Sequence, residues 1–482
     1  MSQPEAREPA RAGELRHGIL GVVDALAQSV ALLSLALGVA FASSAAAAET
    51  GATVPLAYLI AGIGSLCLAS VIIRFTRRMA SAGGLYTYIA RGLNPSTGFL
   101  GGWLYGGGFA VGISFVLVIG SFFLSTFFSV HTSITLSWGW CFVILTVLLA
   151  VLAFLDIRIS TRVQLIFAAL GVAAIMLLAV VILFKGGDSG LSLQPLNPSK
   201  APSSQGLFLA VVLAFTGFIG FEAAAVLGEE AAEPLRAIPR AILAAVVVAL
   251  VYYVFVTWMM SVGYGVGNAG KWAQDPAALD TLATRYVGNW LSVIIDFAVV
   301  ASAFVAALGG LHLTSRTLFA MGRDGGLPRA FAYTHPKYRT PWVGIGASLV
   351  ITIVLTATLA RHYGPITYFL FLATTASLGI LLTYIFVAVS GIVFFSRGRS
   401  GWTANDLFLD VLVPLLAIAI CGYTIYKSIW PRPPHPISYA PWIAGAWLLI
   451  GIVLAVWLNM RSPERVRQFG RTLGEGEAAP TP

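Results

Sequence analysis

The stretch from residue 206 to residue 240 decides the fold of this chain, and it reads GLFLAVVLAFTGFIGFEAAAVLGEEAAEPLRAIPR. It begins as an apolar run of the kind that crosses a membrane, but Gly217, Gly220 and Glu222 interrupt it. A charge inside hydrocarbon is costly and usually marks a substrate or ion path. Glycines let a helix open, which is tolerated only where the exposed backbone lines a cavity. The stretch therefore predicts a broken helix beside a cavity in a membrane.

The composition indicates that apolar runs continue along the whole chain. Of the 482 residues, 58% are hydrophobic and 10% are charged, whereas soluble domains have about 25% charged residues. The strand alternation of a membrane β-barrel is absent. Because a spanning helix needs roughly 20 apolar residues, we predict an all-α polytopic membrane protein with twelve transmembrane helices. The twelve predicted spans are residues 20–45, 54–76, 98–129, 135–155, 160–185, 204–228, 239–266, 287–320, 342–361, 365–395, 406–430 and 437–460.

The distribution of basic residues predicts the orientation of these spans. If the N-terminus lies inside, the tails and loops on that side hold 22 of the 29 Lys and Arg residues. Such a bias is the positive-inside rule. We therefore expect a multi-pass protein of the inner or plasma membrane with both termini in the cytoplasm. The net charge of +9 then reflects topology in the lipid bilayer, and no nucleic-acid partner is expected.

The chain shows a weak internal symmetry. The first span is interrupted by small and polar residues at Ser34, Ala36 and Gly38, and the sixth span is interrupted in the same way from Thr216 to Gly220. Interrupted spans at matching places in two halves indicate inverted repeats around a midplane binding site. The predicted divisions are an N-terminal tail (1–18), repeat 1 (19–185), repeat 2 (204–395), two further spans (406–460) and a C-terminal tail (461–482).

Charged residues near the interruptions have alternative interpretations. Glu222 either carries a proton that drives transport, contacts a cationic substrate, or stabilises the broken helix as a structural carboxylate. Asp296 either faces a solvated vestibule or takes part in coupling. The acidic residues from Glu229 to Glu233 either form a solvated loop or pair with Arg236 and Arg240 in a salt-bridge latch.

Other sequence patterns predict how helices pack and argue against catalytic or metal-binding motifs. Gly98, Gly102 and Gly106 fall four residues apart, as do Gly108 and Gly112, and this spacing predicts close packing between helices. The sequence has no HExxH, GxSxG, or Cys/His cluster. We therefore expect no catalytic residues, no metal site, no cofactor and no enzyme activity.

Four stretches together resemble the amino acid–polyamine–organocation (APC) transporter superfamily, and in particular its amino acid permeases. They are SAGGLYTYIARGLNPSTGFLGGW (81–103), DIRISTRVQ (156–164), FTGFIGFEAAAVLGEEAAEPLRAIPRAI (215–242) and SRTLFAMGRDGGLPRAF (315–331). The resemblance covers about residues 16–400. It implies a fold of five plus five inverted-repeat spans with two extra helices, and alternating access to a substrate held at the breaks of spans 1 and 6.

The resemblance also implies which residues form the site. Backbone N–H groups at the broken helix ends would bind a substrate carboxylate, and backbone carbonyls would bind its ammonium group. The implied substrate-binding residues are Ser34, Ala36, Leu37, Gly38, Phe215, Thr216, Gly217, Phe218 and Gly220. The candidates for coupling or gating are Glu222, Asp296 and Ser302.

Three departures from the family pattern are visible. Span 1 reads SLALG and has only Gly38 where many members have two glycines, and Thr216 stands where many members have an aromatic gate. Gly171 stands where some proton-coupled members have a lysine. We expect a secondary active transporter that moves a small molecule, an amino acid or related amine, with H⁺ as coupling ion. The alternatives are an exchanger without ion coupling and an amino acid sensor that does not transport.

Overall fold

The computed structural model describes residues 13–132, 134–155, 157–188, 190–397, 401, 403–470 and 472. Most of the two predicted tails, including residues 1–12 and 473–482, lies outside the described residues. Within the described ranges the chain forms helices and no strand, apart from one isolated bridge between Leu20 and Ala231. The prediction of an all-α protein is confirmed.

In the described part of the chain, nine helical stretches are long and apolar enough to cross a membrane. They are formed by α1 (Val22–Leu33), α2 (Leu35–Thr50) and α3 (Val54–Thr76) together, α5 (Pro95–His131), α7 (Ile157–Lys185), α9 (Pro234–Tyr264), α12 (Asn289–Arg323), α13 (Trp342–Leu355) with α14 (Arg361–Tyr363), α15 (Pro365–Ser396), α16 (Ala404–Leu407) with α17 (Val413–Ile429), and α18 (Ala440–Arg461).

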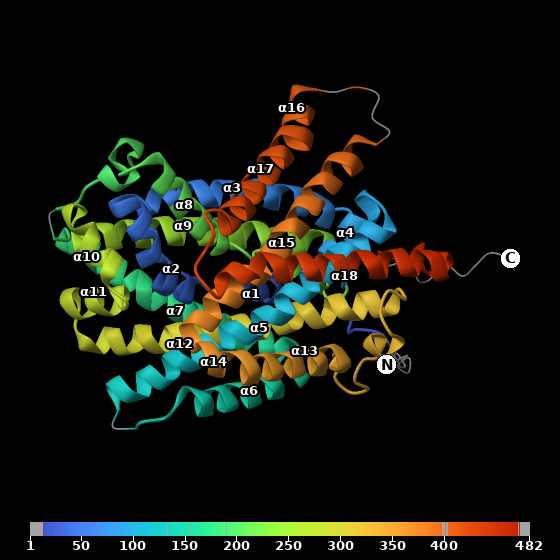
Figure 1. The fold of residues 1–482 in the computed structure, drawn as a ribbon, viewed down its shortest axis with the longest axis horizontal. Helices are drawn as coiled ribbons and strands as arrows, with labels where there is room; N and C mark the ends of the chain where they lie inside the picture. The colour runs from blue at the N-terminus through green and yellow to red at the C-terminus, as the bar shows by residue number, and fades with distance from the viewer. Residues whose placement is uncertain are drawn as a thin grey trace, which may run out of the picture.

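Two of the twelve predicted spans correspond to shorter apolar helices, α6 (Trp138–Phe154) and α8 (Ser204–Thr216). The remaining α-helices are α4 (Leu85–Gly92), α10 (Ala269–Gln274), α11 (Ala278–Tyr286) and α19 (Pro463–Val466). Short 3₁₀ turns are η1 (Gly51–Thr53), η2 (Gln194–Leu196), η3 (Pro198–Lys200), η4 (Ala223–Leu227), η5 (Val266–Asn268), η6 (Arg329–Ala332) and η9 (Ile437–Tyr439), and π-turns are η7 (Thr356–Ala360) and η8 (Phe408–Leu412). Helix α4 lies at one end of the bundle, and α10 and α11 lie at the other (Figure 1).

The predicted close packing at the spaced glycines of α5 is present at Gly98, Gly102 and Gly108, whereas Gly106 has only ordinary contacts and Gly112 meets only side chains of α5 itself. A Cβ atom on Gly98 would lie 2.4 Å from the Cβ of Ala90 in α4, and one on Gly108 would lie 2.9 Å from Ile380 in α15. A Cβ on Gly102 would lie 2.8 Å from the sulfur of Met321 in α12. Helix α5 therefore packs closely against three neighbouring helices, which makes it a central support of the bundle.

The outer helices keep apolar side chains on the surface. On α18, Trp442 and Met460 are 75% and 81% exposed. Large exposed apolar patches are unusual on soluble proteins, and they fit a surface that faces lipid. The interior instead contains α1, α2, η4 and α8, where α1 packs against η4 and α2 packs against α8. The two interrupted segments therefore lie side by side, with each half of one segment against the opposite half of the other.

Candidate functional site

The first interruption falls at a single residue. Ser34 adopts a left-handed conformation (φ 52°, ψ 50°) between the end of α1 at Leu33 and the start of α2 at Leu35. Such a conformation is unfavourable for a residue with a Cβ atom and often marks a functional site. We predicted a break over Ser34–Gly38, but helix α2 already includes Leu35 to Gly38. The break is therefore shorter than predicted.

Ser302 from α12 supports this break. Its Oγ lies 3.1 Å from the Ser34 Oγ and accepts a hydrogen bond from the Leu37 N–H at 3.4 Å. The Ser34 hydroxyl also reaches the Ser302 carbonyl at 3.3 Å. The first turn of a helix has N–H groups without partners inside the helix, and Ser302 supplies a partner from a different helix. The structure thus brings Ser34, Leu37 and Ser302 together.

The second interruption is longer. Helix α8 ends at Thr216, and the chain continues through turns from Gly217 to Glu222 before η4 begins. Gly220 has φ +105°, and a Cβ atom there would lie 2.7 Å from the Leu32 side chain in α1. Glycine is therefore required both by the conformation of the backbone and by the close approach of the first interrupted segment. The break predicted from Gly217 and Gly220 is present in the structure.

Glu222 is the last residue of the second break. Its side chain is fully buried, and the Tyr105 hydroxyl of α5 donates a hydrogen bond to its Oε1 at 2.7 Å. A second tyrosine, Tyr384 of α15, also lies beside this carboxyl group, and its hydroxyl oxygen accepts a bond from the Gly220 N–H at 3.4 Å. Glu222 is thus linked through hydroxyl groups to two helices and to the second break.

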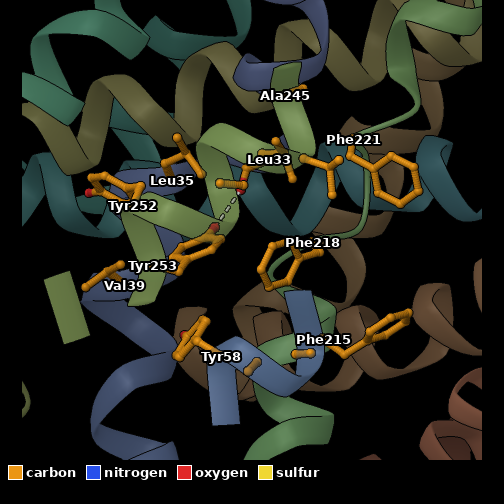
Figure 2. Packing of buried hydrophobic residues seen from close by; sticks show 14 of the residues in the cluster. Leu33, Leu35, Val39, Tyr58, Phe215, Phe218, Phe221, Ala245, Tyr252 and Tyr253 are labelled. Carbon is orange, nitrogen blue, oxygen red and sulfur yellow. Dashed lines mark hydrogen bonds between the residues drawn. The ribbon is translucent and has the colours of Figure 1, made fainter. Parts of the chain in front are cut away.

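The phenylalanines of the second break are buried in this conformation. Phe215 and Phe218 are 2% and 1% exposed, while Thr216 is exposed. Figure 2 shows Phe215, Phe218 and Phe221 packed among the helices of the core. Of the three adjacent residues Phe215, Thr216 and Gly217, the two that are accessible are therefore the smaller ones. The assignment of the two phenylalanines to substrate binding stays a prediction.

Asp296 is separate from the breaks. It lies near the start of α12, where its Oδ2 is 2.8 Å from the Nε2 of His131 at the end of α5. Ser302 follows six residues later, which places it almost two helical turns further along α12. Asp296 and Glu222 therefore have different hydrogen-bond partners, on different parts of the described chain.

A small cavity adjoins the first break. Its lining is mostly apolar, and it has room for about one water molecule. The residues that line it are Val30, Ala31, Leu35, Ala36, Phe167, Ala168, Gly171, Ser302 and Val305. A Cβ atom on Gly171 would lie 3.3 Å from the Cβ of Ala36. The position where some family members have a lysine is thus filled closely by α2.

One residue that the sequence did not point to contacts both breaks. Tyr253 of α9 is fully buried, and its hydroxyl lies 3.2 Å from the Leu33 carbonyl oxygen and 3.1 Å from the Gly217 carbonyl oxygen. Figure 2 shows the bond to Leu33 and the rings that surround Tyr253. Its sequence context, VYYVFV (251–256), reads only as part of an apolar span, so no local signal could have identified it.

A second polar group lies toward the end of the bundle that carries α4. We name it the ionic cluster and define it as Glu229, Glu230, Arg316, Arg323 and Asp324. Arg316 and Glu230 form a bidentate pair at 2.5 and 3.0 Å with both side chains buried. Arg323 binds both carboxylate oxygens of Glu229 at 2.9 and 3.0 Å. Neither alternative for the acidic run holds for Glu229 and Glu230, which are buried and pair with Arg323 and Arg316. The predicted pairing with Arg236 is present only at Glu233.

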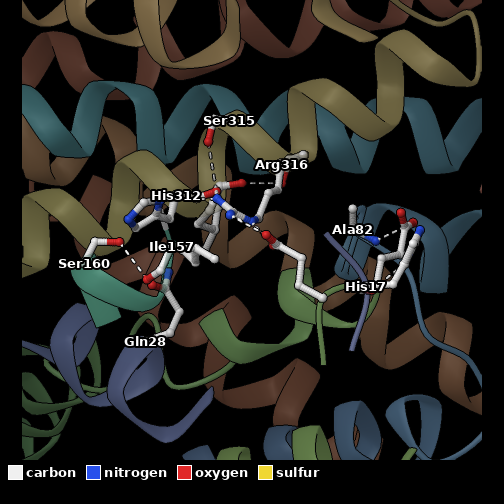
Figure 3. Close-up of polar contacts among 12 residues, drawn as sticks. His17, Gln28, Ala82, Ile157, Ser160, His312, Ser315 and Arg316 are labelled. Carbon is white, nitrogen blue, oxygen red and sulfur yellow. Dashed lines mark hydrogen bonds and ion pairs between the residues drawn. The ribbon is translucent and has the colours of Figure 1, made fainter. Parts of the chain in front are cut away.

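Arg236 contacts only the exposed Glu233, at 3.4 Å. The arginines that pair with Glu229 and Glu230 come from the 315–331 stretch, far away in the sequence. The Ala82 N–H from the 81–103 stretch donates to Glu229 at 2.9 Å, and His312 contacts Arg316 at 3.2 Å (Figure 3). Three of the four stretches that carry the family resemblance therefore meet at this cluster.

Both ends of the described chain border the ionic cluster. The Ile19 and Leu20 N–H groups donate to the Glu230 carbonyl at 2.9 and 3.0 Å. The Gly470 N–H donates to Asp324 at 2.9 Å, and the Tyr86 hydroxyl donates to the same carboxylate at 2.9 Å. These hydrogen bonds tie the two terminal segments to the ionic cluster.

Comparison with known proteins places these features in a family. The model of a family described as amino acid permease matches residues 20–454. The chain is 24% identical over 448 residues to the branched-chain amino acid permease BcaP of Bacillus subtilis, which covers 89% of this chain and 90% of that protein. It is 27% identical over 432 residues to the low-affinity putrescine importer PlaP of Escherichia coli K12, covering 86% and 88%. A methylthioribose transporter of Bacillus subtilis is 23% identical over 423 residues, covering 83% and 85%. The family match includes both breaks and the ionic cluster.

Proposed function

This chain belongs to the amino acid permease family, and from that premise we propose that it is a secondary active transporter that moves an amino acid or related amine by alternating access. The family and the named relatives are transporters and not enzymes. Together with the apolar helices, this makes the chain a multi-pass membrane protein. The finer steps of the proposal concern the site, the coupling ion and the topology.

The observation that carries the proposal is the adjacency of the two helix breaks. The carbonyl oxygens of Leu33 and Gly217 lie within hydrogen-bond distance of one common group, so an ammonium group placed beside them would find two acceptors. The first turn of α2 offers N–H groups, and helix N-termini attract carboxylates. An α-amino acid presents both charges on neighbouring carbons, which suits this arrangement. A diamine would use the carbonyl part alone.

For coupling, we propose that Glu222 carries the proton. It is the buried carboxyl group nearest in sequence to the second break, and it bonds to Tyr105 while sharing Tyr384 with Gly220. A change in its protonation would alter the hydrogen bonds that support the break. A proton can drive accumulation only if it binds preferentially in one of the two conformations. Asp296 is the second candidate.

The topology in the proposal is twelve spans in two inverted repeats of five with two extra helices, and both termini in the cytoplasm. The crossed packing of α1 with η4 and of α2 with α8 supports opposite orientations for the two repeats. A reporter fused at residue 482 that is active only outside the cytoplasm should stay inactive. Activity of that reporter would overturn the proposed orientation.

The function is tested in proteoliposomes with a panel of amino acids and putrescine, with and without an inward proton gradient. We expect accumulation of at least one compound that depends on the gradient. Exchange without any gradient-driven accumulation would favour the exchanger, and binding without any flux would favour the sensor.

The coupling step is tested with Glu222→Gln in the same vesicles. This variant should lose gradient-driven accumulation and keep substrate-for-substrate exchange, because exchange needs only the loaded carrier to change conformation. Glu233→Gln, at an exposed position, is the matched control and should behave as the wild type. Wild-type accumulation by Glu222→Gln would assign Glu222 a structural role.

A further inference from the structure

The hydroxyl of Tyr253 has two acceptors and one proton. It lies 3.2 Å from the Leu33 oxygen at the end of α1 and 3.1 Å from the Gly217 oxygen just after the end of α8. Among the described residues, no other side chain donates to either oxygen, and no backbone N–H outside the regular helical pattern does so. Because a hydroxyl donates one hydrogen bond at a time, the Tyr253 proton serves only one of the two carbonyl oxygens at a time. A ligand with N–H or O–H groups at the junction of the two breaks would therefore find an acceptor there.

The ring of Tyr253 is held in place by three other aromatic rings. The ring centroids of Tyr58, Phe218 and Tyr252 lie 5.0, 5.2 and 5.7 Å from its own, and Figure 2 shows Tyr58 and Phe218 beside it. Aromatic pairs at such separations are stabilising beyond the area that they bury. The hydroxyl is therefore a fixed point, and the two carbonyl oxygens are held within hydrogen-bond distance of it.

Gly38 provides the space for this hydroxyl. A Cβ atom at residue 38 would lie 2.6 Å from the Tyr253 oxygen and 3.4 Å from two ring carbons. Only the contact to the oxygen is too short for a real Cβ atom, and the contacts to the ring are ordinary. Gly38 lies inside α2 rather than at the break, so its backbone conformation does not require glycine. Glycine is needed there because the Tyr253 hydroxyl lies too close for a Cβ atom.

We propose that Tyr253 is a positioning residue that keeps the Leu33 and Gly217 carbonyl oxygens close to each other for the ammonium group of the substrate. In the same proposal, the absence of a side chain at Gly38 leaves the space that the Tyr253 hydroxyl occupies. Each carbonyl oxygen has two lone pairs, so an ammonium group with three donors can bind both oxygens while the hydroxyl keeps one of them. The ammonium part of this inference rests on the proposed function. The Gly38–Tyr253 part does not.

The Gly38–Tyr253 part is tested by a double-mutant cycle on thermal unfolding of the purified protein. Gly38→Ala should destabilise the wild type, because the new methyl group meets the hydroxyl. In the Tyr253→Phe background the same change should be neutral or stabilising, since alanine favours a helix interior over glycine by roughly 1 kcal/mol. Gly422→Ala, where nothing lies within 4 Å of the added carbon, is the control. Equal effects of Gly38→Ala on thermal stability in both backgrounds would show that Gly38 is not needed to make space for the Tyr253 hydroxyl.

The positioning role is tested by uptake of leucine and of putrescine. Tyr253→Phe should raise KM about tenfold for the transported compound, in line with the loss of one hydrogen bond, and should leave Vmax within about twofold. If Tyr253 had only a structural role, Tyr253→Phe would instead lower the amount of active protein, and therefore Vmax. Tyr252→Phe is the matched control, because the Tyr252 hydroxyl is buried and has no partner among the described residues.

The double variant separates the two roles. Gly38→Ala with Tyr253→Phe should regain thermal stability relative to Gly38→Ala alone and should keep the raised KM. An unchanged KM in Tyr253→Phe would overturn the positioning role. If the wild type takes up neither leucine nor putrescine nor any other compound of the panel, both the proposed function and the proposed ammonium site are contradicted. The thermal cycle would still decide the contact between Gly38 and Tyr253.

Discussion

The two polar regions of the interior are held together by different kinds of interaction. At the helix breaks the contacts are neutral hydrogen bonds: the Tyr253 hydroxyl is one donor shared between two carbonyl oxygens, and the Ser302 hydroxyl accepts from the Leu37 N–H. In the ionic cluster, two arginines bind two carboxylates, and the Arg316–Glu230 pair is entirely buried. The breaks can therefore exchange partners at low cost, while the ionic cluster separates only when buried charges lose their partners.

The magnitudes support this contrast. A neutral hydrogen bond contributes about 0.5–1.5 kcal/mol net, so a substrate can replace one without disturbing the fold. Removing one partner of a buried ion pair costs about 3–5 kcal/mol. The difference fits the proposed function, in which the substrate would bind at the breaks, while the ionic cluster stabilises the packing of its helices. Variants at each region can break or sharpen this comparison.

The largest effect is expected at the buried ion pair. Arg316→Met would leave Glu230 buried without its bidentate partner, and should lower the free energy of unfolding by about 3–5 kcal/mol. Denaturant unfolding of the purified protein measures this. Adding Glu230→Gln should recover part of the loss because it removes the unpaired charge. A loss below about 1 kcal/mol for Arg316→Met would show that this pair does not stabilise the fold as a buried ion pair should.

The next largest effect is expected on transport at the second break. A side chain at Gly217 would start 3.2 Å from the Ala214 carbonyl oxygen and 3.6 Å from the Tyr253 hydroxyl. Gly217→Leu should lower uptake at least about tenfold, since overpacking typically costs 1–3 kcal/mol, while the protein still inserts into the membrane. Radiolabelled uptake normalised to the amount of inserted protein measures this. Gly422→Leu is the control, and normal kinetics in Gly217→Leu would place the substrate elsewhere.

A smaller effect is expected at the first break. Ser302→Ala removes the hydroxyl that accepts from the Leu37 N–H and contacts Ser34. Loss of a hydroxyl that caps a helix start costs about 1 kcal/mol, so the melting temperature should fall modestly. Ser428→Ala, which removes a hydroxyl that bonds only within its own helix, should change it less. Equal changes in the two variants would mean that Ser302 does not support the break.

The smallest effect is expected at the exposed ion pair. Arg236 and Glu233 are 74% and 68% exposed, and pairs of this kind contribute about 0–1 kcal/mol. Arg236→Met should therefore leave both unfolding and uptake close to the wild type. This variant is also the reference for Arg316→Met, because both remove an arginine from a pair with a glutamate. A large effect of Arg236→Met would remove the contrast between buried and exposed pairs.

Local sequence signals predicted the second break better than the first. Gly217 and Gly220 mark a break because glycine weakens a helix and tolerates positive φ, and the structure has the break there. The first break depends on Ser34 alone, whose left-handed conformation is supported by Ser302 of a different helix. Gly38 looked like part of that break, but its actual constraint is the hydroxyl of Tyr253. Signals carried by side chains from distant helices cannot be read from a local pattern.

The sequence by itself determined that the chain is all-α, that it is apolar enough to enter a membrane, and where the sixth segment is interrupted. These properties follow from transfer free energies and backbone preferences that each segment has on its own. Only the tertiary structure decided that Arg316 and Arg323 pair with the acidic run, and that Tyr253 joins the two breaks. Such pairings depend on which helices pack together, because a hydrogen bond or an ion pair forms only between groups that the whole fold brings within about 3 Å of each other.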